Sequence, residues 1–179
     1  EKVVKYLDIP IQHVNDRILK KMNRRGTRAE LETLFRKLRE RIPGVVLRTS
    51  LITGLPGEGE AEFEELCEFL REFRLERAGA FGFSPEEGTA AAKMDYPPRE
   101  DAERRAEVLT ELQAGVMEEF SESLVGETRE VLCEGFDEET GLWYGRSYAD
   151  SPDIDGRVFF TSETRRTPGE FVRVFIGDT

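Results

Sequence analysis

The chain has 179 residues, of which 38% are hydrophobic and 35% charged, so it is long enough and apolar enough to fold and is not a disordered low-complexity tract. Its net charge of -11 excludes a general attraction to nucleic-acid backbones or anionic membranes and favours a basic partner. No apolar run reaches the ~20 residues of a membrane span and no signal peptide is present, which predicts a cytoplasmic protein. The chain starts and stops in strand patterns without an initiator Met, so we expect both ends to continue in a longer protein.

Three successive strand-and-helix units are predicted up to about residue 126. The predicted strands cover residues 3–9, 45–53 and 78–83. Asn15 can cap a short helix, and Thr27 with Glu30 has the spacing of a capping box. Longer helices are predicted over 60–74 and 99–124. Strands separated by helices predict a parallel sheet of the α/β class, either as a compact three-strand layer or as part of a larger barrel or open sheet.

After Gly126 the pattern changes to short strands separated by turns. Strand-like runs cover residues 129–133, 142–146, 157–160 and 171–176. The segments between them contain Gly with acidic residues or Pro, as turns do. Four or five short strands in this length predict a small antiparallel barrel, and they place a domain boundary near residue 126.

The stretch GLPGEGEAEF follows the second predicted strand, at the end where ligands bind in parallel α/β folds. It is not a P-loop or a dinucleotide fingerprint, because it lacks GK[ST] and GxGxxG, and its acidic residues would repel a pyrophosphate. Gly54 and Gly57 can equally be turn residues that bind nothing.

Arg48 lies within the second strand, where alternation puts it on one face with Ser50 and puts Leu47 and Thr49 on the other. A buried arginine needs a partner, and either Asp8 on the preceding strand or a ligand carboxylate could provide it. His13 is the only histidine, and a lone loop histidine is more typical of a surface or hydrogen-bonding role than of a base.

The two cysteines, Cys67 and Cys133, are far apart and indicate neither a disulfide framework nor a metal cluster. Cys67 lies on the apolar side of its predicted helix, which favours packing in the core. No catalytic triad or carboxylate dyad can be assembled from the chain, so the catalytic residue stays unidentified.

Four stretches in order, YLDIPIQHVNDRILKKMNRRG, LRTSLITGLPGE, FGFSPEEGT and GRSYADSPDIDG, resemble the radical S-adenosylmethionine methylthiotransferases. The last stretch resembles the branch that methylthiolates an aspartate of a small-subunit ribosomal protein. The resemblance implies that residues 1–126 are three βα units of a partial (β/α)6 TIM barrel. It implies that residues 127–179 are a five-stranded, OB-like TRAM barrel truncated at its C-terminus.

The resemblance also implies S-adenosylmethionine and two [4Fe-4S] clusters in the full-length enzyme. The cysteines of the CxxxCxxC motif that bind the radical-generating cluster are absent from this chain, so we expect it to be inactive alone, with no metal ligand of its own. The residues that match the cofactor-binding elements are Gln12, Arg48, Ser50, Gly54, Pro56, Gly57, Phe83 and Ser84.

Charge favours a protein substrate over tRNA. Residues 127–179 contain six Arg and no Lys against twelve Asp and Glu, a net charge of -6. Such a domain should repel phosphates and attract a basic ribosomal protein, with Asp150, Asp153 and Asp155 as the docking loop. Two alternatives stay open: the tRNA-modifying branch of the family, and a non-catalytic module that binds a basic protein.

Overall fold

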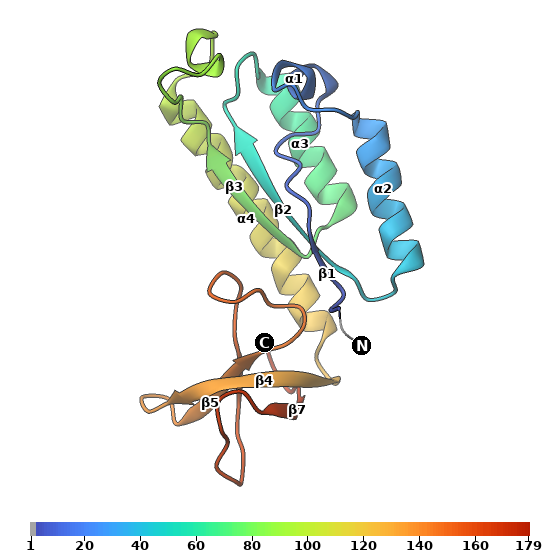
Figure 1. Cartoon of the computed structure of the whole chain (residues 1–179), viewed down its shortest axis with the longest axis vertical. Coiled ribbons are helices and arrows are strands. Elements are labelled where there is room, and N and C mark those ends of the chain that lie inside the picture. The colour runs from blue at the N-terminus through green and yellow to red at the C-terminus, as the bar shows by residue number, and fades with distance from the viewer. Residues whose placement is uncertain (1–2) are drawn as a thin grey trace. The chain divides into compact units, whose positions relative to one another are not determined.

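The structure is a computed structural model that describes residues 3–179, and it forms two compact units (Figure 1). The first unit is Leu7–Met117, and the second combines the described residues before Leu7 with Glu118–Thr179. Among residues 3–179, no helix has the length and apolarity needed to cross a membrane.

The first unit contains the three predicted βα units. Its elements are β1 (Tyr6–Asp8), α1 (Asp16–Lys21), α2 (Arg28–Arg41), β2 (Val46–Thr53), α3 (Glu60–Phe73), β3 (Arg77–Gly82), the 3-10 turn η1 (Ala91–Lys93) and α4 (Arg99–Ser123), which continues into the second unit. β1 is shorter than the strand predicted over 3–9. Pro10 follows closely and cannot donate a backbone hydrogen bond, and pairing resumes only at Gln12, which bridges Leu51 in the parallel sense.

Local sequence signals determine where the first helices begin. The Asn15 side chain accepts hydrogen bonds from the amides of Arg17 and Ile18 at 3.0 and 3.1 Å. Thr27 and Glu30 form the predicted capping box: the Glu30 amide donates to Thr27 Oγ1 and the Thr27 amide donates to Glu30 Oε2. These side chains satisfy amides that have no partner inside the helix.

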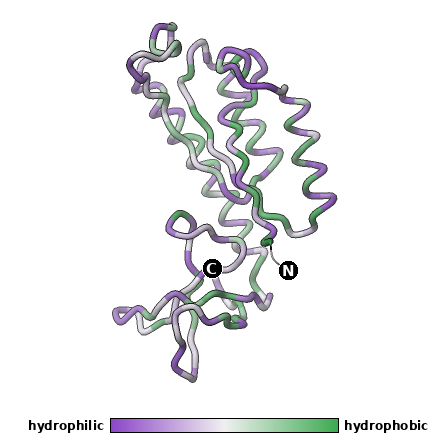
Figure 2. Tube along the Cα trace, in the orientation of Figure 1, coloured by the Kyte–Doolittle hydropathy of each residue, from purple (hydrophilic) through white to green (hydrophobic). Residues whose placement is uncertain are grey.

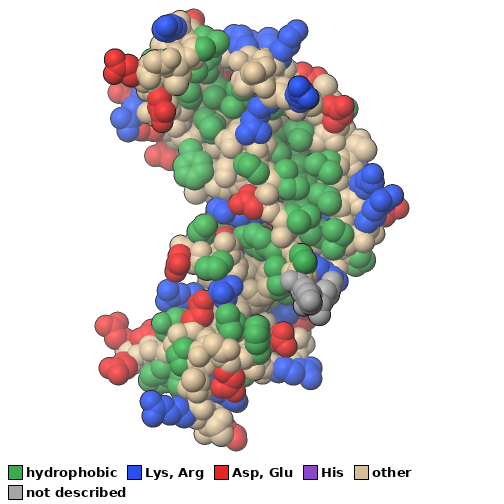
Figure 3. Space-filling view, in the orientation of Figure 1, with side chains coloured by type: hydrophobic (Ala, Val, Ile, Leu, Met, Phe, Trp, Pro, Cys, Tyr) green, Lys and Arg blue, Asp and Glu red, His purple; other side chains and the backbone are tan. Residues whose placement is uncertain are grey.

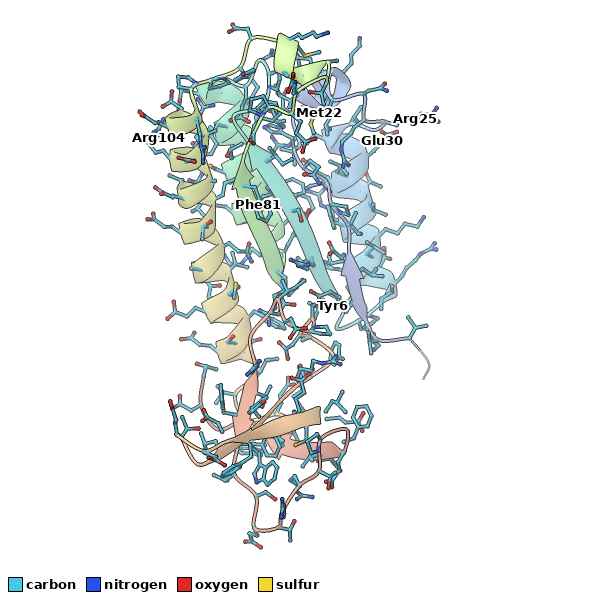
Figure 4. The ribbon with its side chains drawn as sticks, turned by 60° about the vertical axis from the view of Figure 1, so that its left-hand side comes forward. Tyr6, Met22, Arg25, Glu30, Phe81 and Arg104 are labelled. Carbon is cyan, nitrogen blue, oxygen red and sulfur yellow. The ribbon has the colours of Figure 1, made fainter. Side chains whose placement is uncertain are left out.

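The three strands lie in the order β1-β2-β3, with β2 and β3 parallel and Arg48 opposite Arg77. The predicted alternation along β2 is confirmed, since Leu47, Thr49, Leu51 and Thr53 are buried whereas Arg48, Ser50 and Ile52 are half-buried. The buried face packs against all three long helices through Phe35 of α2, Phe69 of α3 and Leu109 of α4. The opposite face is open, and Phe81 on it is 57% exposed (Figure 4).

Hydropathy follows this division. Apolar segments concentrate where the strands and helices of the first unit meet, and polar segments lie on the outer faces of α2 and α4 (Figure 2). Phe69 and Phe73 stack with ring centroids 4.4 Å apart, and Phe35 meets Phe69 edge-on at 5.9 Å. This aromatic group fixes α2 against α3 and so holds the loops at the ends of the strands.

The second unit is an antiparallel sheet. Its strands are β4 (Thr128–Asp137), β5 (Leu142–Arg146), β6 (Val158–Phe160) and β7 (Phe171–Phe175), in the order β6-β5-β4-β7. The described residues hold four strands, within the four or five that the sequence patterns predicted and one fewer than the resemblance implied. β4 has ten residues and pairs with both β5 and β7, and a register shift between Cys133 and Gly135 bends it. Val131 and Cys133 form the centre of its small core.

Candidate functional site

The turn after β2 binds a carboxylate of its own. The amides of Gly54 and Leu55 donate to the two oxygens of Glu58, at 2.9 and 3.4 Å. Glu58 is only 4% exposed. Amides that point into a turn of this kind form an anion site in phosphate-binding loops, and here an internal anion occupies it. The Gly54 and Leu55 amides are therefore not available to a phosphate, in agreement with the absence of a P-loop sequence.

Glycine is required in this turn for two separate reasons. Gly54 and Gly57 have φ angles of +72° and +82°, in the left-handed region that residues with a Cβ seldom adopt. A Cβ at Gly54 would also lie 2.3 Å from the Cβ of Ala102 in α4. The turn therefore touches the helix backbone closely, and its shape depends on α4.

A buried polar network holds this turn to two other segments. Arg105 of α4, 5% exposed, donates from Nη1 to Glu58 Oε1 at 2.8 Å, and its Nη2 lies 2.6 Å from Glu60. His13, in the loop after β1 and fully buried, points Nε2 at Glu58 Oε2 at 3.4 Å. Its Nδ1 accepts from the amides of Val14 and Asn15, so its N–H is on Nε2. Glu58 thus joins two loops and one helix.

The same contacts determine the ionisation of Glu58. Burial by itself raises the pKa of this carboxyl, but the contacts with His13, the Gly54 amide and Arg105 outweigh burial and leave the pKa below its usual value. Glu58 is therefore a carboxylate at neutral pH.

The structure brings several predicted cofactor-binding residues to one edge of the first unit. The Gln12 amide donates to the Ser50 carbonyl at 2.9 Å, and the Gln12 carbonyl accepts from the Ile52 amide at 2.8 Å. Gln12 itself has a φ of 68°, an uncommon conformation for a residue with a side chain. Gln12, in the loop after β1, is therefore a backbone neighbour of Ser50 on β2.

The Phe83 amide donates to the Thr53 carbonyl at 2.8 Å, which places Phe83 beside the start of the glycine turn. Its ring meets Tyr96 at 5.4 Å between centroids, and Ser84 is exposed. Pro56 is buried in the turn. The loops after all three strands therefore end at the same edge.

Arg48 has a protein partner. Its Nη1 lies 3.2 Å from Asp8 Oδ2 on β1, which is the structural alternative that the sequence left open. The Arg48 side chain is 17% exposed and the Asp8 side chain 45% exposed, so the pair lies at the surface of the open face of the sheet. A ligand carboxylate would have to bind Arg48 together with Asp8 or displace Asp8 from it.

Sequence reasoning missed Glu58 and Arg105 as functional residues and undervalued His13. The available signals were weak: Glu58 is the first acid after Gly57, and Arg105 is one of several arginines in an exposed-looking helix. Arg105 lies 47 positions from Glu58, and no local pattern reports a contact at that separation.

The docking loop predicted in the second unit uses two of its three acids internally. Asp150 Oδ2 accepts from the amide and the hydroxyl of Ser147 at 2.9 and 2.7 Å, and Asp155 Oδ2 accepts from the Ser151 amide at 2.8 Å. Asp153 is exposed at the loop tip with a φ of 61°, next to Ile154, which is 61% exposed. Asp153 is therefore the acid best placed to meet a partner.

Both cysteines are buried, as predicted for Cys67. Burial raises the pKa of Cys67 to about 11 and also raises that of Cys133. They belong to different units, and no group of three potential ligand side chains converges within residues 3–179. These residues therefore do not fit an iron–sulfur cluster.

Two family models match the chain: the radical SAM superfamily over residues 1–70 and the TRAM domain over residues 125–179. Proteins named ribosomal protein uS12 methylthiotransferase RimO are similar along nearly the whole chain. The one from Caldanaerobacter subterraneus subsp. tengcongensis is 47% identical over 99% of this chain, the one from Lachnoclostridium phytofermentans 48% over 98%, and the one from Bdellovibrio bacteriovorus 43% over 99%. The chain spans about 40% of the length of these relatives. With both matched domains in this order and these relatives, the chain belongs to the radical SAM methylthiotransferases.

Proposed function

We propose that this chain is part of a cytoplasmic enzyme that adds a methylthio group to the β-carbon of an aspartate in ribosomal protein uS12. The relatives carry the name of that substrate, and the family supplies the class of reaction. The observation that carries the proposal is the convergence of three strand-end loops around a glycine turn whose amides bind Glu58. Such a turn offers a backbone surface to a nucleoside, which carries no phosphate and does not need the amides that Glu58 occupies.

The first unit would hold the nucleoside and the amino-acid portion of S-adenosylmethionine, the group that supplies the radical and methyl chemistry when bound in this family. Gly54, Pro56 and Gly57 would form one wall of the nucleoside site, with Phe83 and Ser84 at its edge. Arg48 would bind the carboxylate of the cofactor, because it is a cation on the open sheet face and its partner Asp8 is half in solvent. Gln12 and Ser50 would lie beside the ribose.

The iron–sulfur clusters would be bound by residues outside this chain, since Cys67 and Cys133 are buried and separate. The chain alone would therefore bind substrate without turning it over. The second unit would recognise uS12 through the Asp150–Asp155 loop, consistent with the net charge of -6 over residues 127–179.

Calorimetric titration of the full-length protein with S-adenosylmethionine tests the cofactor assignment. Arg48→Ala should weaken binding by roughly 10- to 100-fold, the usual loss for a hydrogen bond to a charged group. Arg36→Ala is the matched control, because Arg36 also pairs with a carboxylate, Glu72 at 2.7 Å, but lies on α2. Unchanged affinity in Arg48→Ala would reject the role of Arg48.

A second measurement tests whether turnover needs the full-length protein. Mass spectrometry of uS12 incubated with the reconstituted full-length protein should show the added methylthio group on an aspartate, and the 179-residue chain should add none. Methylthiolation by the short chain would contradict the proposal.

A further inference from the structure

The segment after β1 carries a basic surface that the proposed reaction does not use. Residues 17–28, RILKKMNRRGTR, contain six cationic side chains and no acid, in a chain whose net charge is -11. Figure 3 shows Lys and Arg side chains gathered over α1 and the turn that follows it. We call this surface the basic rim; its members are Arg17, Lys20, Lys21, Arg24, Arg25 and Arg28.

The rim borders the candidate site. Arg17 Nη2 donates to the Gly57 carbonyl at 2.8 Å, and Arg24 Nη1 donates to the Pro10 carbonyl at 2.9 Å. Lys21 Nζ also approaches Gly57 closely, since a Cβ built there would meet it. The rim is therefore tied to the glycine turn and to the loop after β1, at the edge where the three loops meet.

Most of the rim charge is not neutralised by the protein. Two of the six cations are paired, Arg17 with Glu62 and Arg28 with Glu32, Glu65 and Glu68. Asp16 and Glu30 accept hydrogen bonds from backbone amides and keep their negative charge. Within residues 3–179, Lys20, Lys21, Arg24 and Arg25 have no carboxylate within ion-pair distance. All four are exposed, and Figure 4 shows Arg25 pointing outward beside the start of α2.

Local charge governs binding at such a surface. At physiological ionic strength the screening length is about 8 Å, so acids elsewhere on the protein contribute little at the rim. Closely spaced lysines and arginines bind phosphates by releasing condensed counterions, and a short run of such residues is a recurrent nucleic-acid contact. Four neighbouring cations can bind several charges of one polyanion at once. A ligand with a single carboxylate could pair with only one of them.

We propose that the basic rim binds the phosphate backbone of RNA next to the target protein. The relatives are named for a ribosomal protein, and a ribosomal protein has RNA around it in its particle. RNA is a docking partner here and not the group that is modified. The rim beside the site and the acidic loop of the second unit would then contact the two chemically different components of one particle.

Fluorescence anisotropy of the full-length protein with a labelled single-stranded RNA of about 20 nucleotides tests this, over KCl from about 50 to 200 mM. The double variant Lys20→Gln/Arg25→Gln should bind roughly 20-fold more weakly at about 0.1 M salt, and the slope of log Kd against log salt should fall by about 1.4, since each phosphate contact on a single strand contributes about 0.7. Neither residue has a role in the proposed cofactor site.

Lys37→Gln/Arg41→Gln is the matched control. Both side chains are exposed on α2, neither has an ion-pair partner among the described residues, and the change in charge is the same. Figure 1 shows this end of α2 away from α1. The control should change the affinity by less than about twofold, because its charges lie beyond the screening length.

Equal losses of RNA affinity in the two double variants would overturn the proposal. Polyglutamate that displaced the labelled RNA as effectively as unlabelled RNA does would also overturn it, because that result would indicate an acidic protein partner. If the double variant melts early, the single reversal Lys20→Glu, at an exposed position, replaces it with the same expectation. RNA binding requires no turnover, so this result is independent of the methylthiolation assay.

Discussion

Glu58 and Arg105 form a buried ion pair that joins the turn after β2 to helix α4, with 2.8 Å between Oε1 and Nη1. Glu58 is 4% and Arg105 5% exposed. A pair so deeply buried costs desolvation when it forms, and removing Glu58 leaves the buried guanidinium of Arg105 with only the exposed carboxylate of Glu60. The pair therefore specifies how the turn sits on the helix, and substitutions at either residue should be unusually harmful.

Glu58→Gln should lower the free energy of unfolding by about 3–5 kcal/mol, the range for breaking a buried pair. Glu60→Gln is the control: Glu60 contacts the same guanidinium at 2.6 Å, but its side chain is 73% exposed, so the loss should be about 0–1 kcal/mol. Urea denaturation of the two variants measures both values. Similar losses would show that burial does not distinguish the two carboxylates.

The lowered pKa of Glu58 predicts a pH dependence of stability. A carboxyl whose folded pKa lies below its unfolded value of 4.5 contributes stability above pH 4.5 and loses it as the pH falls toward the folded pKa. Unfolding free energies measured from pH 7 down to pH 3 should therefore drop below about pH 4.5. In Glu58→Gln that drop should be smaller, and an unchanged profile would assign the acid sensitivity to other groups.

Gly54→Ala and Gly88→Ala separate backbone strain from crowding. Both glycines have positive φ angles, +72° and +84°, but a Cβ at Gly54 would meet Ala102 whereas one at Gly88 would meet nothing within 4 Å. Gly88→Ala should cost about 1–2 kcal/mol from the left-handed conformation alone. Gly54→Ala should cost about 1–3 kcal/mol more because the helix must move. Thermal melts of the two variants give the comparison.

Cys67 should resist alkylation in the folded protein. Its pKa of about 11, against an ordinary value of 9.0, makes the thiolate about 100-fold scarcer near pH 8, and the side chain is also buried. Iodoacetamide followed by peptide mass spectrometry should label Cys67 slowly in buffer and rapidly in urea. Fast labelling in buffer would mean that α3 opens readily.

The two kinds of acid in the docking loop should behave differently. Asp153→Asn should weaken binding of uS12, most at low salt, without changing the melting temperature, because Asp153 is exposed and Asn tolerates its positive φ. Asp150→Ala should lower the melting temperature of the second unit, because Asp150 holds Ser147 through two hydrogen bonds. Unchanged binding in Asp153→Asn would remove this residue from the substrate surface.

Sequence predicted what depends on neighbours along the chain. The Asn15 and Thr27 caps, the βα order and the buried and open faces of β2 all follow from patterns within a few residues, and the structure confirms them. The Glu58 network could not be predicted, because its members come from three segments that are far apart in the sequence and meet only in the folded protein.

The fifth strand was expected from the resemblance, whereas the described residues form four. Turn chemistry marks where strands end but does not reveal that β4 continues past Cys133 and pairs with two neighbours. The register shift that allows this has no signature stronger than a glycine at position 135. Alternation along the strand placed Arg48 on the correct face. It did not decide whether Asp8 or a ligand carboxylate is the partner of Arg48, because that contact lies between two strands.

In the first unit, strand order in space is the same as strand order along the chain. Each strand pairs with the strand that precedes it along the chain, across α1 and α2 between β1 and β2 and across α3 between β2 and β3. Each parallel pairing must close a loop that contains at least one helix, which makes it slower than hairpin pairing, but it needs no strand from later in the chain, and this suits a chain that emerges gradually during synthesis. The sheet can assemble stepwise, one βα unit at a time, without waiting for its last strand.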